Sequence, residues 1–413
     1  MEAFIHSDQF PPEDEAWRSR LQGLDPKRYA ATRNHLNGAV SRISPYLTHG
    51  FISLGDAVNE IRHRNRLNRD DKLFAEFAWR AFFHHVWTNK DEAIFQDLRP
   101  AIANVSYAME LPADIREGRT GIPAIDLAVS SLYSAGYLHN HARMWLASYI
   151  VHLRHVHWKA GADWMYSHLL DGDLASNHLS WQWVAGTFST KPYLFNAENV
   201  SKYAPAEWGC QKTPLDTSYE SLEQMAFGAG ESDREAFLKL ANYSQQKRPA
   251  LEEPVLYDSP PVSMLAGLSC PVFGATRMNL GESDIVEFVH PWSLRADSLV
   301  AGFEIQGPYR LGVIHLPWHA RWPWSYRRWQ FVLSRMGSLC DAIFVGNAHI
   351  LTGLVPTNKK YYVVTDLGAR QTQDALAPLN PRVLKPDPLF AEPEFFCQSF
   401  SKYFRAVTES KRT

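Results

Sequence analysis

The sequence predicts a mostly helical N-terminal part followed by a smaller parallel α/β part. From about residue 14 to residue 205, apolar residues recur at helical spacing and no alternating strand pattern interrupts them. Short β-branched runs appear from Asp284 onward, with a helical stretch between two of them. Strand, helix and strand in that order are typical of a parallel sheet, so we expect an α + α/β protein.

The chain of 413 residues is long enough for two or three domains, taking about 150 residues per domain. We expect a helical domain over residues 1–210 and an α/β domain over residues 266–413. The sequence between them, residues 211–265, is polar, acidic and rich in proline, which predicts a linker with one helical segment near Ser232–Tyr243.

In the helical part, the clearest periodicity runs from Ala142 to Trp158, and turn clusters such as 48–50 and 171–173 separate the helices. In the α/β part, we expect strands at the sequences IVEFV, LGVIHL, DAIFVGN and YYVVTDLG, and a helix over Tyr326–Cys340. No glycine-rich phosphate loop is present, so the sequence does not support a Rossmann-type cofactor site.

Composition excludes several classes of protein. The 42 Lys and Arg residues against 44 Asp and Glu predict no general attraction to polyanions, so any nucleic-acid surface must be a local patch. No apolar run approaches the roughly 18 residues of a membrane span. The N-terminus lacks the pattern of a secretory signal, and the four cysteines are far apart, which predicts a cytoplasmic protein with reduced thiols.

One helical stripe stands out as a candidate site. Glu76, Trp79, Arg80 and Phe83 follow one another at positions i, i+3, i+4 and i+7, which places a carboxylate, an indole and a guanidinium on one face. A purely apolar core does not favour a carboxylate or a guanidinium, because burying a charge is costly without a partner. Such groups cluster at functional sites, although structural ion pairs also produce them.

Two further motifs have both a functional and a structural interpretation. Ser41 and Ser44 flank a proline-led helix start and could hold a phosphate or simply cap the helix. The run DGDLASNHLSWQW combines two carboxylates with two indoles, and its alternative is a turn, a helix cap and a buried tryptophan pair.

Two histidine groups and a run rich in Arg and Trp also have both a functional and a structural interpretation. Two histidine groups, at 139–141 and 152–157, could ligate a metal, but we interpret them as structural and predict no metal site. The run from Arg321 to Trp329 is rich in Arg and Trp, which suits nucleic acid or a planar ligand, or equally a solvated helix start with indoles in the core.

An ordered set of motifs across about 190 residues resembles the FAD-binding domain of the cryptochrome and DNA photolyase family. The motifs are Tyr29 with Arg33 and Asn34, SRISPYLTHGFIS, AEFAWR, EGRTGIPAID, GYLHNHARM, DGDLASNHLSWQW and PYLFN. The resemblance implies a helical domain that holds FAD in a folded U shape.

Cofactor contacts follow from the resemblance position by position. The residues that match contacts to the FAD diphosphate are Tyr29, Ser41, Ile43 and Ser44, while Val40 stands where a Thr is usual. Those that match the surroundings of the isoalloxazine are Arg143, Asp171, Asp173 and Asn177. A guanidinium there would stabilise a reduced, anionic flavin.

The lesion pocket also follows from the resemblance. The residues that match the pocket of photolyases for cyclobutane pyrimidine dimers are Glu76, Trp79, Asn140, Met144 and Trp183. Indoles can stack on a flipped-out dimer, and polar side chains can bond its base edges. His141 stands where this class has an Arg, and Tyr137 where it has a Trp. Trp181 and Trp158 match the first two members of the electron-transfer chain, with Tyr107 a possible third.

Photolyases usually carry an α/β antenna domain before the flavin domain, whereas here the loosely similar α/β sequence follows it. The resemblance therefore implies a permuted arrangement, against the alternative of an unrelated α/β module, and leaves any second antenna chromophore unknown.

The resemblance implies a flavin-dependent photolyase that uses blue or near-ultraviolet light to split pyrimidine dimers in damaged DNA. Arg62, Arg64 and Arg66 are the candidates for gripping DNA phosphates. One alternative is a cryptochrome-like photoreceptor that binds FAD and signals to a protein partner. Another is a helical binding protein that has lost FAD, suggested by Val40.

Overall fold

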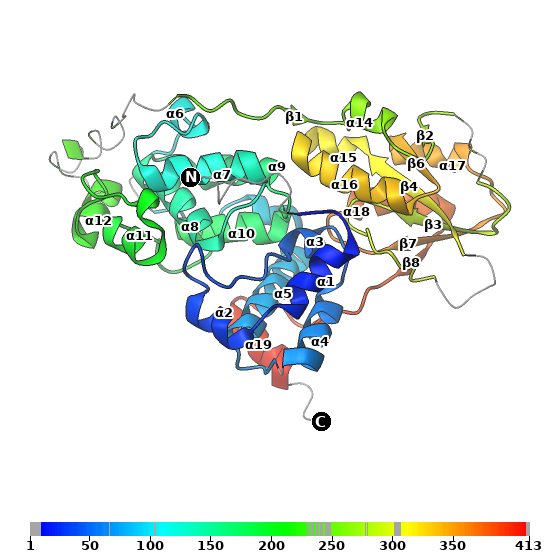
Figure 1. Ribbon diagram of the computed structural model, residues 1–413, viewed down its shortest axis with the longest axis horizontal. Helices are drawn as coiled ribbons and strands as arrows, with labels where there is room; N and C mark the ends of the chain where they lie inside the picture. The colour runs from blue at the N-terminus through cyan, green and yellow to red at the C-terminus, as the bar shows by residue number, and fades with distance from the viewer. Residues whose placement is uncertain are drawn as a thin grey trace.

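The computed structural model describes residues 10–409, apart from 66, 103–104, 229, 277, 279, 301–306 and most of 231–248. Figure 1 shows a helical part at one end of the molecule and a sheet flanked by helices at the other. The first helices of the chain and the last one lie together below their junction. The predicted α + α/β class is confirmed.

The helical part is built from short and medium helices. They are α1 (Asp14–Gln22), α2 (Pro26–Thr32), α3 (Ser44–Thr48), α4 (Leu54–Asn65), α5 (Lys72–Lys90), α6 (Ala113–Arg116), α7 (Pro123–Ala135), α8 (Asn140–Ser148), α9 (Trp158–His168), α10 (Leu174–Ala185), α11 (Ala197–Tyr203) and α12 (Tyr219–Phe227). Side-chain caps begin several of them. Asp25 accepts from the backbone of α2 before a proline at its first position, and Asp173 accepts from Ser176 at the start of α10.

The α/β part contains a six-stranded parallel sheet in the order β2-β6-β4-β3-β7-β8. Its strands are β2 (Val272–Phe273), β3 (Ile285–Val289), β4 (Tyr309–His315), β6 (Ala342–Gly346), β7 (Lys360–Val364) and β8 (Arg382–Leu384). The flanking helices are α14 (Val262–Ala266), α15 (Leu316–Arg321), α16 (Tyr326–Leu339), α17 (Leu351–Leu354) and α18 (Arg370–Leu376). A separate antiparallel pair joins β1 (Leu256–Tyr257) to β5 (Trp324–Ser325).

Alternate residues of the central strands face opposite sides of the sheet. Phe288 and Val313 belong to a core with α17 and α18, whereas Val289 and Ile314 belong to a core with α16. That second core continues without a break into α1, α4 and α5 of the helical part. The two parts therefore share one hydrophobic core.

A tight loop contact also joins the two parts. Gly50 has a φ of +64°, and a Cβ there would lie 2.3 Å from the carbonyl oxygen of Trp292. Only glycine fits both the left-handed backbone and the close approach. The next residue back, His49, is completely buried beneath the same segment.

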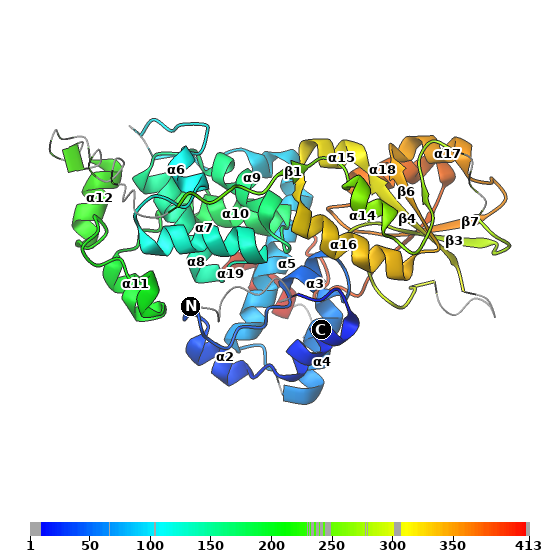
Figure 2. The same ribbon diagram turned by 45° about the horizontal axis from the view of Figure 1, so that its top comes forward.

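The end of the chain leaves the sheet and returns to the helical part. Helix α19 (Phe400–Glu409) packs against α5, which lies at the centre of the molecule in Figures 1 and 2. Phe400, Tyr403 and Phe404 contact rings on α5. The segment before it is fixed by His85, whose ring contacts Glu392 and accepts from the backbone of Cys397.

The predicted strands correspond to β3, β4, β6 and β7, with bounds within two residues except that β7 ends four residues before the predicted end at 368, and the predicted helix at 326–340 is α16. Helix α12, the helix α19 and the short strands β1, β2, β5 and β8 were not predicted. The helix predicted near Ser232–Tyr243 falls in a stretch that is largely outside the described residues. The boundaries at 210 and 265 stay predictions.

Buried neutral histidines predict acid sensitivity. Burial lowers the pKa of His49 to about 3 and those of His152 and His290 to about 4. In the unfolded chain these rings bind protons near pH 6.5, so below that pH the unfolded state holds more protons and stability falls towards pH 4. Each ring contributes up to about 1.4 kcal/mol per pH unit.

Asp366 opposes this trend, because burial raises the pKa of its carboxyl to about 6 in the folded protein. As the pH falls below 6, the folded state binds this proton before the unfolded state does, which stabilises the folded state. Burial also raises the pKa of Glu76 and Glu287, but it lowers the pKa of His139 and His315 to about 4. The histidines outnumber the opposing carboxyls, so the melting temperature should fall steadily between pH 6.5 and pH 4.5. Thermal unfolding across that range measures it, and His152→Gln should flatten the slope. A melting temperature independent of pH over this range would contradict the prediction.

Candidate functional site

Asp171 is the centre of the predicted flavin site. Arg143 Nη2 donates to both carboxylate oxygens at 2.9 and 2.7 Å, and Ser44 Oγ donates to Oδ2 at 2.6 Å. Thr48 Oγ1 also donates to the backbone carbonyl of Asp171 at 3.2 Å. Three helices, α3, α8 and the N-terminal end of α10, thus meet at one carboxylate whose side chain is only 4% exposed. The structure brings Arg143 and Asp171 together as the resemblance implied, and it adds Ser44, which was assigned to the diphosphate side.

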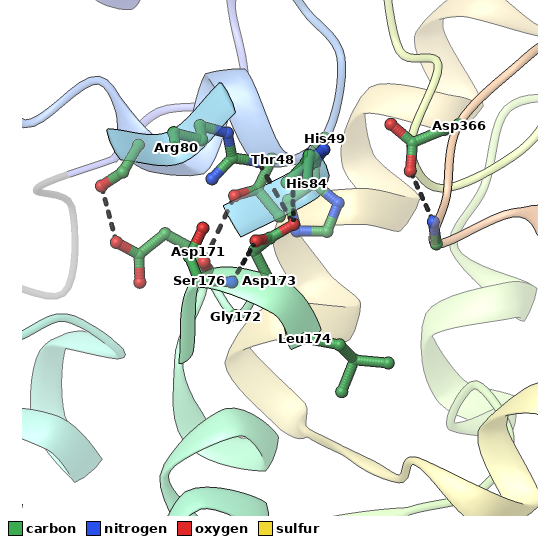
Figure 3. Close-up of polar contacts among 12 residues, drawn as sticks. Thr48, His49, Arg80, His84, Asp171, Gly172, Asp173, Leu174, Ser176 and Asp366 are labelled. Carbon is green, nitrogen blue, oxygen red and sulfur yellow. Dashed lines mark hydrogen bonds and ion pairs between the residues drawn. The ribbon is translucent and has the colours of Figure 1, made fainter. Parts of the chain in front are cut away.

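A second carboxylate cluster lies two residues further on. His84 Nε2 lies 2.9 Å and Arg80 Nη2 3.4 Å from Oδ2 of Asp173, as Figure 3 shows. Burial opposes ionisation of Asp173, but His84 and Arg80 together hold its pKa well below the usual range. The other oxygen, Oδ1, accepts from the backbone of Ser176 at 2.8 Å. Asp173 is therefore an ionised helix cap.

Tyr29, Tyr137 and Glu76 lie on the other side of Arg143. Arg33 donates to Glu76 at 2.7 Å, and the charge of Glu76 adds to burial in raising the pKa of Tyr29. Tyr137 lies under Arg143, 5.4 Å from the guanidinium carbon to the ring centroid. Burial raises the pKa of Glu76, although Arg33 opposes that shift.

Glu76 on α5 and His141 on α8 each contact the turn after α2. Arg33 bonds Glu76, and the carbonyl of the next residue, Asn34, lies 2.8 Å from Nδ1 of His141. Asn140 is exposed at the start of α8, and its Nδ2 lies 3.7 Å from Sδ of Met144 one turn later.

Trp79 is covered by the end of the chain. Its ring stacks on Phe400 of α19 with centroids 4.0 Å apart and planes at 6°. The neighbouring rings on α5, Phe82 and Phe83, lie at 5.7 and 5.4 Å from Trp79. Phe400 thus occupies a ring face on which a flipped-out base was predicted to stack.

The predicted electron-transfer residues are buried side chains of α9 and α10. Trp158 Nε1 donates to Asp97 at 2.6 Å, and Tyr107 lines the same small cavity as Trp158. Trp181 packs so closely on α9 that a Cβ at Gly161 would lie 2.3 Å from its ring. Trp183 instead points outward, with 37% of its surface exposed and its ring centroid 6.1 Å from that of Tyr193.

The remaining predicted cofactor residues are Asn177, Ile43 and Ser41. Asn177 is buried and donates to the carbonyl of Ala162 at 2.8 Å. Ile43 is buried immediately before α3, and Ser41 is partly exposed in the preceding segment. The roles assigned to these residues stay predictions.

The structure favours the core interpretation of the basic aromatic run. Trp322, Trp324, Arg328 and Trp329 are buried, and Arg321 pairs with Glu92 at 2.6 Å. Of the arginines predicted to grip DNA, Arg64 pairs with Glu60 and Arg62 lies over Phe74, while Arg66 lies outside the described residues. Within the described ranges, no group of three or more His, Cys, Asp or Glu side chains could hold a metal ion.

Sequence reasoning missed three contributors. His84 follows Glu76 and Arg80 at i+8 and i+4, so helical spacing could have placed it on the same face. Phe400 and Arg328 reach the site from the C-terminal part, and no local pattern signals such long-range contacts.

Residues 73–208 match the family model described as the FAD binding domain of DNA photolyase. The chain is similar to proteins of the photolyase/cryptochrome family. The predicted resemblance is confirmed, and the description of the matched model names the predicted cofactor, FAD.

Photolyase and cryptochrome relatives match part of the chain. The deoxyribodipyrimidine photo-lyase of Streptomyces griseus is 39% identical over 150 residues, which cover 36% of this chain and 32% of the relative. The cryptochrome DASH of Solanum lycopersicum is 30% identical over 168 residues, which cover 39% of this chain and 29% of the relative. Both kinds of photolyase/cryptochrome protein are therefore similar to this chain.

A solved structure, the cryptochrome of Synechocystis sp. PCC6803, matches with a TM-score of 0.43 and 26% identity over 48% of this chain and 46% of that one. The chain spans about a third of the length of the first curated relatives it matches. In the described part of the chain, no helix combines the length and the apolar character needed to cross a bilayer.

Proposed function

We propose that the protein is an FAD-dependent photolyase that repairs cyclobutane pyrimidine dimers in DNA under light. The observation that carries the proposal is the joint arrangement of two neighbouring sites. Arg143 on α8 and Arg80 on α5 contact the neighbouring carboxylates of Asp171 and Asp173, and the same two helices carry Asn140, Met144 and Glu76. The match of this region to the photolyase FAD-binding domain supports the same activity.

The side chains present fit FAD. Ser176 Oγ, three residues after Asp173, is buried and has no hydrogen-bond partner among the described residues, so it could accept or donate to a bound polar group. Tyr29, Ser41, Ile43 and Ser44 would hold the diphosphate side. The residues on the isoalloxazine side would be Arg143, Asp171, Asp173 and Asn177. Bound FAD would supply the light-driven electron that opens the cyclobutane ring.

The protein's own contribution is binding and orientation. Trp79 presents a ring for stacking, Glu76 and Asn140 present polar atoms for the base edges, and Arg143 fixes the carboxylate that faces the cofactor. Damaged DNA is thus the proposed partner. A second antenna chromophore is not assigned, and a cytoplasmic location stays a prediction.

A light-dependent repair assay tests the proposal. The purified protein is loaded with FAD, chemically reduced and mixed with an oligonucleotide that contains one thymine dimer. We expect dimer loss after blue illumination and none in the dark. Stoichiometric FAD without any light-dependent dimer loss would contradict repair, and failure to take up FAD would contradict the whole proposal.

The alternative function is a cryptochrome-like photoreceptor with a protein partner. The specific observation that favours it is Phe400 on Trp79, because a covered stacking face suits a protein that does not receive a flipped base. The similarity to cryptochrome DASH is compatible with it. The repair assay separates the two functions, because a photoreceptor should bind FAD and leave the dimer intact.

A further inference from the structure

A buried arginine from the α/β part lies directly under the turn that carries Asp171 and Asp173. Arg328 on α16 is 0% exposed. Its Nη2 donates to the carbonyl of Gly172 at 2.6 Å, and its Nη1 donates to that of Tyr166 at 3.2 Å. One guanidinium thus bridges the C-terminal end of α9 and the middle residue of the turn.

The two carbonyls need such a donor. Tyr166 lies in the last turn of α9, where carbonyl oxygens have no partner within the helix. A cation at this end also interacts favourably with the helix dipole. The planar fork of an arginine can reach two oxygens in fixed directions, which a lysine ammonium cannot do in the same way.

Packing fixes the guanidinium in place. Its Cζ lies 4.0 Å from the ring centroid of Trp324 and 4.8 Å from that of Tyr166. A Cβ at Gly172 would lie 2.5 Å from Arg328 Nη1, so the turn approaches the arginine as closely as a glycine allows. Such stacking on two rings leaves the side chain little freedom to move away.

Arg328 also has no carboxylate partner of its own. Among the described residues it forms no ion pair, yet Asp171 and Asp173 are near enough for their charges to act on it. His49 and His319 lie close and are neutral, because burial and then the charge of Arg328 lower their pKa. The positive charge of Arg328 therefore interacts with the carboxylates of Asp171 and Asp173 from the α/β part.

His49 makes a second contact with the same segment. The ring of His49 lies 2.9 Å from the carbonyl of Leu170 and 2.7 Å from that of Pro291, and as a neutral imidazole it donates to one of them. Arg328 thus contacts the segment from 166 to 172 at both ends, and His49 lies against the same segment at Leu170.

We propose that Arg328 is a positioning residue through which the α/β part sets the geometry of the Asp171–Gly172–Asp173 turn, and so the affinity of the helical part for FAD. The inference rests on the proposed function. It gives the C-terminal part a role in cofactor binding that needs no second chromophore.

The test uses the full chain with Arg328→Met and Arg328→Lys. The control is Arg335→Met, a buried arginine two turns further along α16 that bonds Asp14 at 2.6 Å and lies 4.7 Å from the ring of Phe51, away from the turn. FAD affinity is measured by equilibrium dialysis and fluorescence, and folding by circular dichroism and melting temperature.

We expect Arg328→Met to weaken FAD binding about 10- to 100-fold, as is typical when a residue that orients ligand-binding groups is removed. Arg328→Lys should recover the melting temperature more than the affinity, because the charge returns without the fork. Arg335→Met should lower the melting temperature without a matching loss of affinity. Equal effects of Arg328→Met and Arg335→Met on both readouts would overturn the inference.

Amide hydrogen exchange of the protein without FAD separates this inference from the proposed function. If wild type binds no FAD, the proposed function fails, but Arg328→Lys should still increase exchange at residues 169–174 relative to Arg335→Lys. Unchanged exchange there would overturn the positioning role. If Arg328→Met does not fold, FAD affinity and hydrogen exchange are both measured on Arg328→Lys.

Discussion

Asp171→Asn should abolish stoichiometric FAD binding and lower the stability of the protein without FAD. Asp171 accepts two bonds from Arg143 and one from Ser44, and its side chain is 4% exposed while that of Arg143 is 23% exposed. The amide has nearly the same shape but no charge, so the guanidinium loses its counter-ion. Removing one partner of a buried pair costs about 3–5 kcal/mol, because the other charge stays buried. Thermal and urea unfolding measure the loss.

An exposed ion pair provides the control. Glu60 and Arg64 are one helical turn apart on α4, with side chains 39% and 50% exposed. Glu60→Gln should change stability by no more than about 1 kcal/mol, because water screens such pairs. Comparable losses in the two variants would show that the Asp171 pair has no special structural role. Retained FAD in Asp171→Asn would remove this residue from the proposed cofactor site.

Local patterns account for most of what could be predicted about the fold. Buried parallel strands such as Ala342–Gly346 are short apolar runs, and α16 has an apolar stripe, so both are visible in one stretch of sequence. Strand β8 is largely exposed and β2 has two residues, which leaves no such pattern. Helix α19 could be recognised as amphipathic, but its docking on α5 depends on contacts more than 300 residues apart.

The candidate site also contains residues that could be assigned from the sequence and residues that could not. The motif resemblance paired Arg143 with Asp171, and the structure brings them into contact. Sequence reasoning offered no means of assigning Arg328 to that cluster, because its run of Arg and Trp fits a DNA-binding surface as well as a core. The complete burial of Arg328 favours the core over a DNA-binding surface, and burial depends on the whole fold.

Trp79→Ala should remove most of the preference for DNA that contains a pyrimidine dimer. If a flipped-out dimer stacks on this indole, its loss costs about 1–3 kcal/mol per base, which is about 5- to 150-fold in affinity. FAD binding should persist, since the described contacts of Trp79 are with Phe82, Phe83 and Phe400 and not with the carboxylate clusters. Gel-shift titration of damaged and undamaged oligonucleotides measures the preference.

Phe400→Ala should act in the opposite direction, and this difference of sign makes the test specific. In the structure Phe400 stacks on the Trp79 ring at 4.0 Å, so a dimer must displace α19 before it can use that face. An aromatic pair contributes about 0.5–1.5 kcal/mol beyond burial, so removing Phe400 should tighten binding of damaged DNA about two- to tenfold. Phe404→Ala removes a neighbouring ring of α19 that stacks on Phe400 and serves as the control for loss of helix packing. If Trp79→Ala and Phe400→Ala both weaken binding, α19 forms part of the DNA-binding surface; if neither changes it, the lesion does not stack on Trp79.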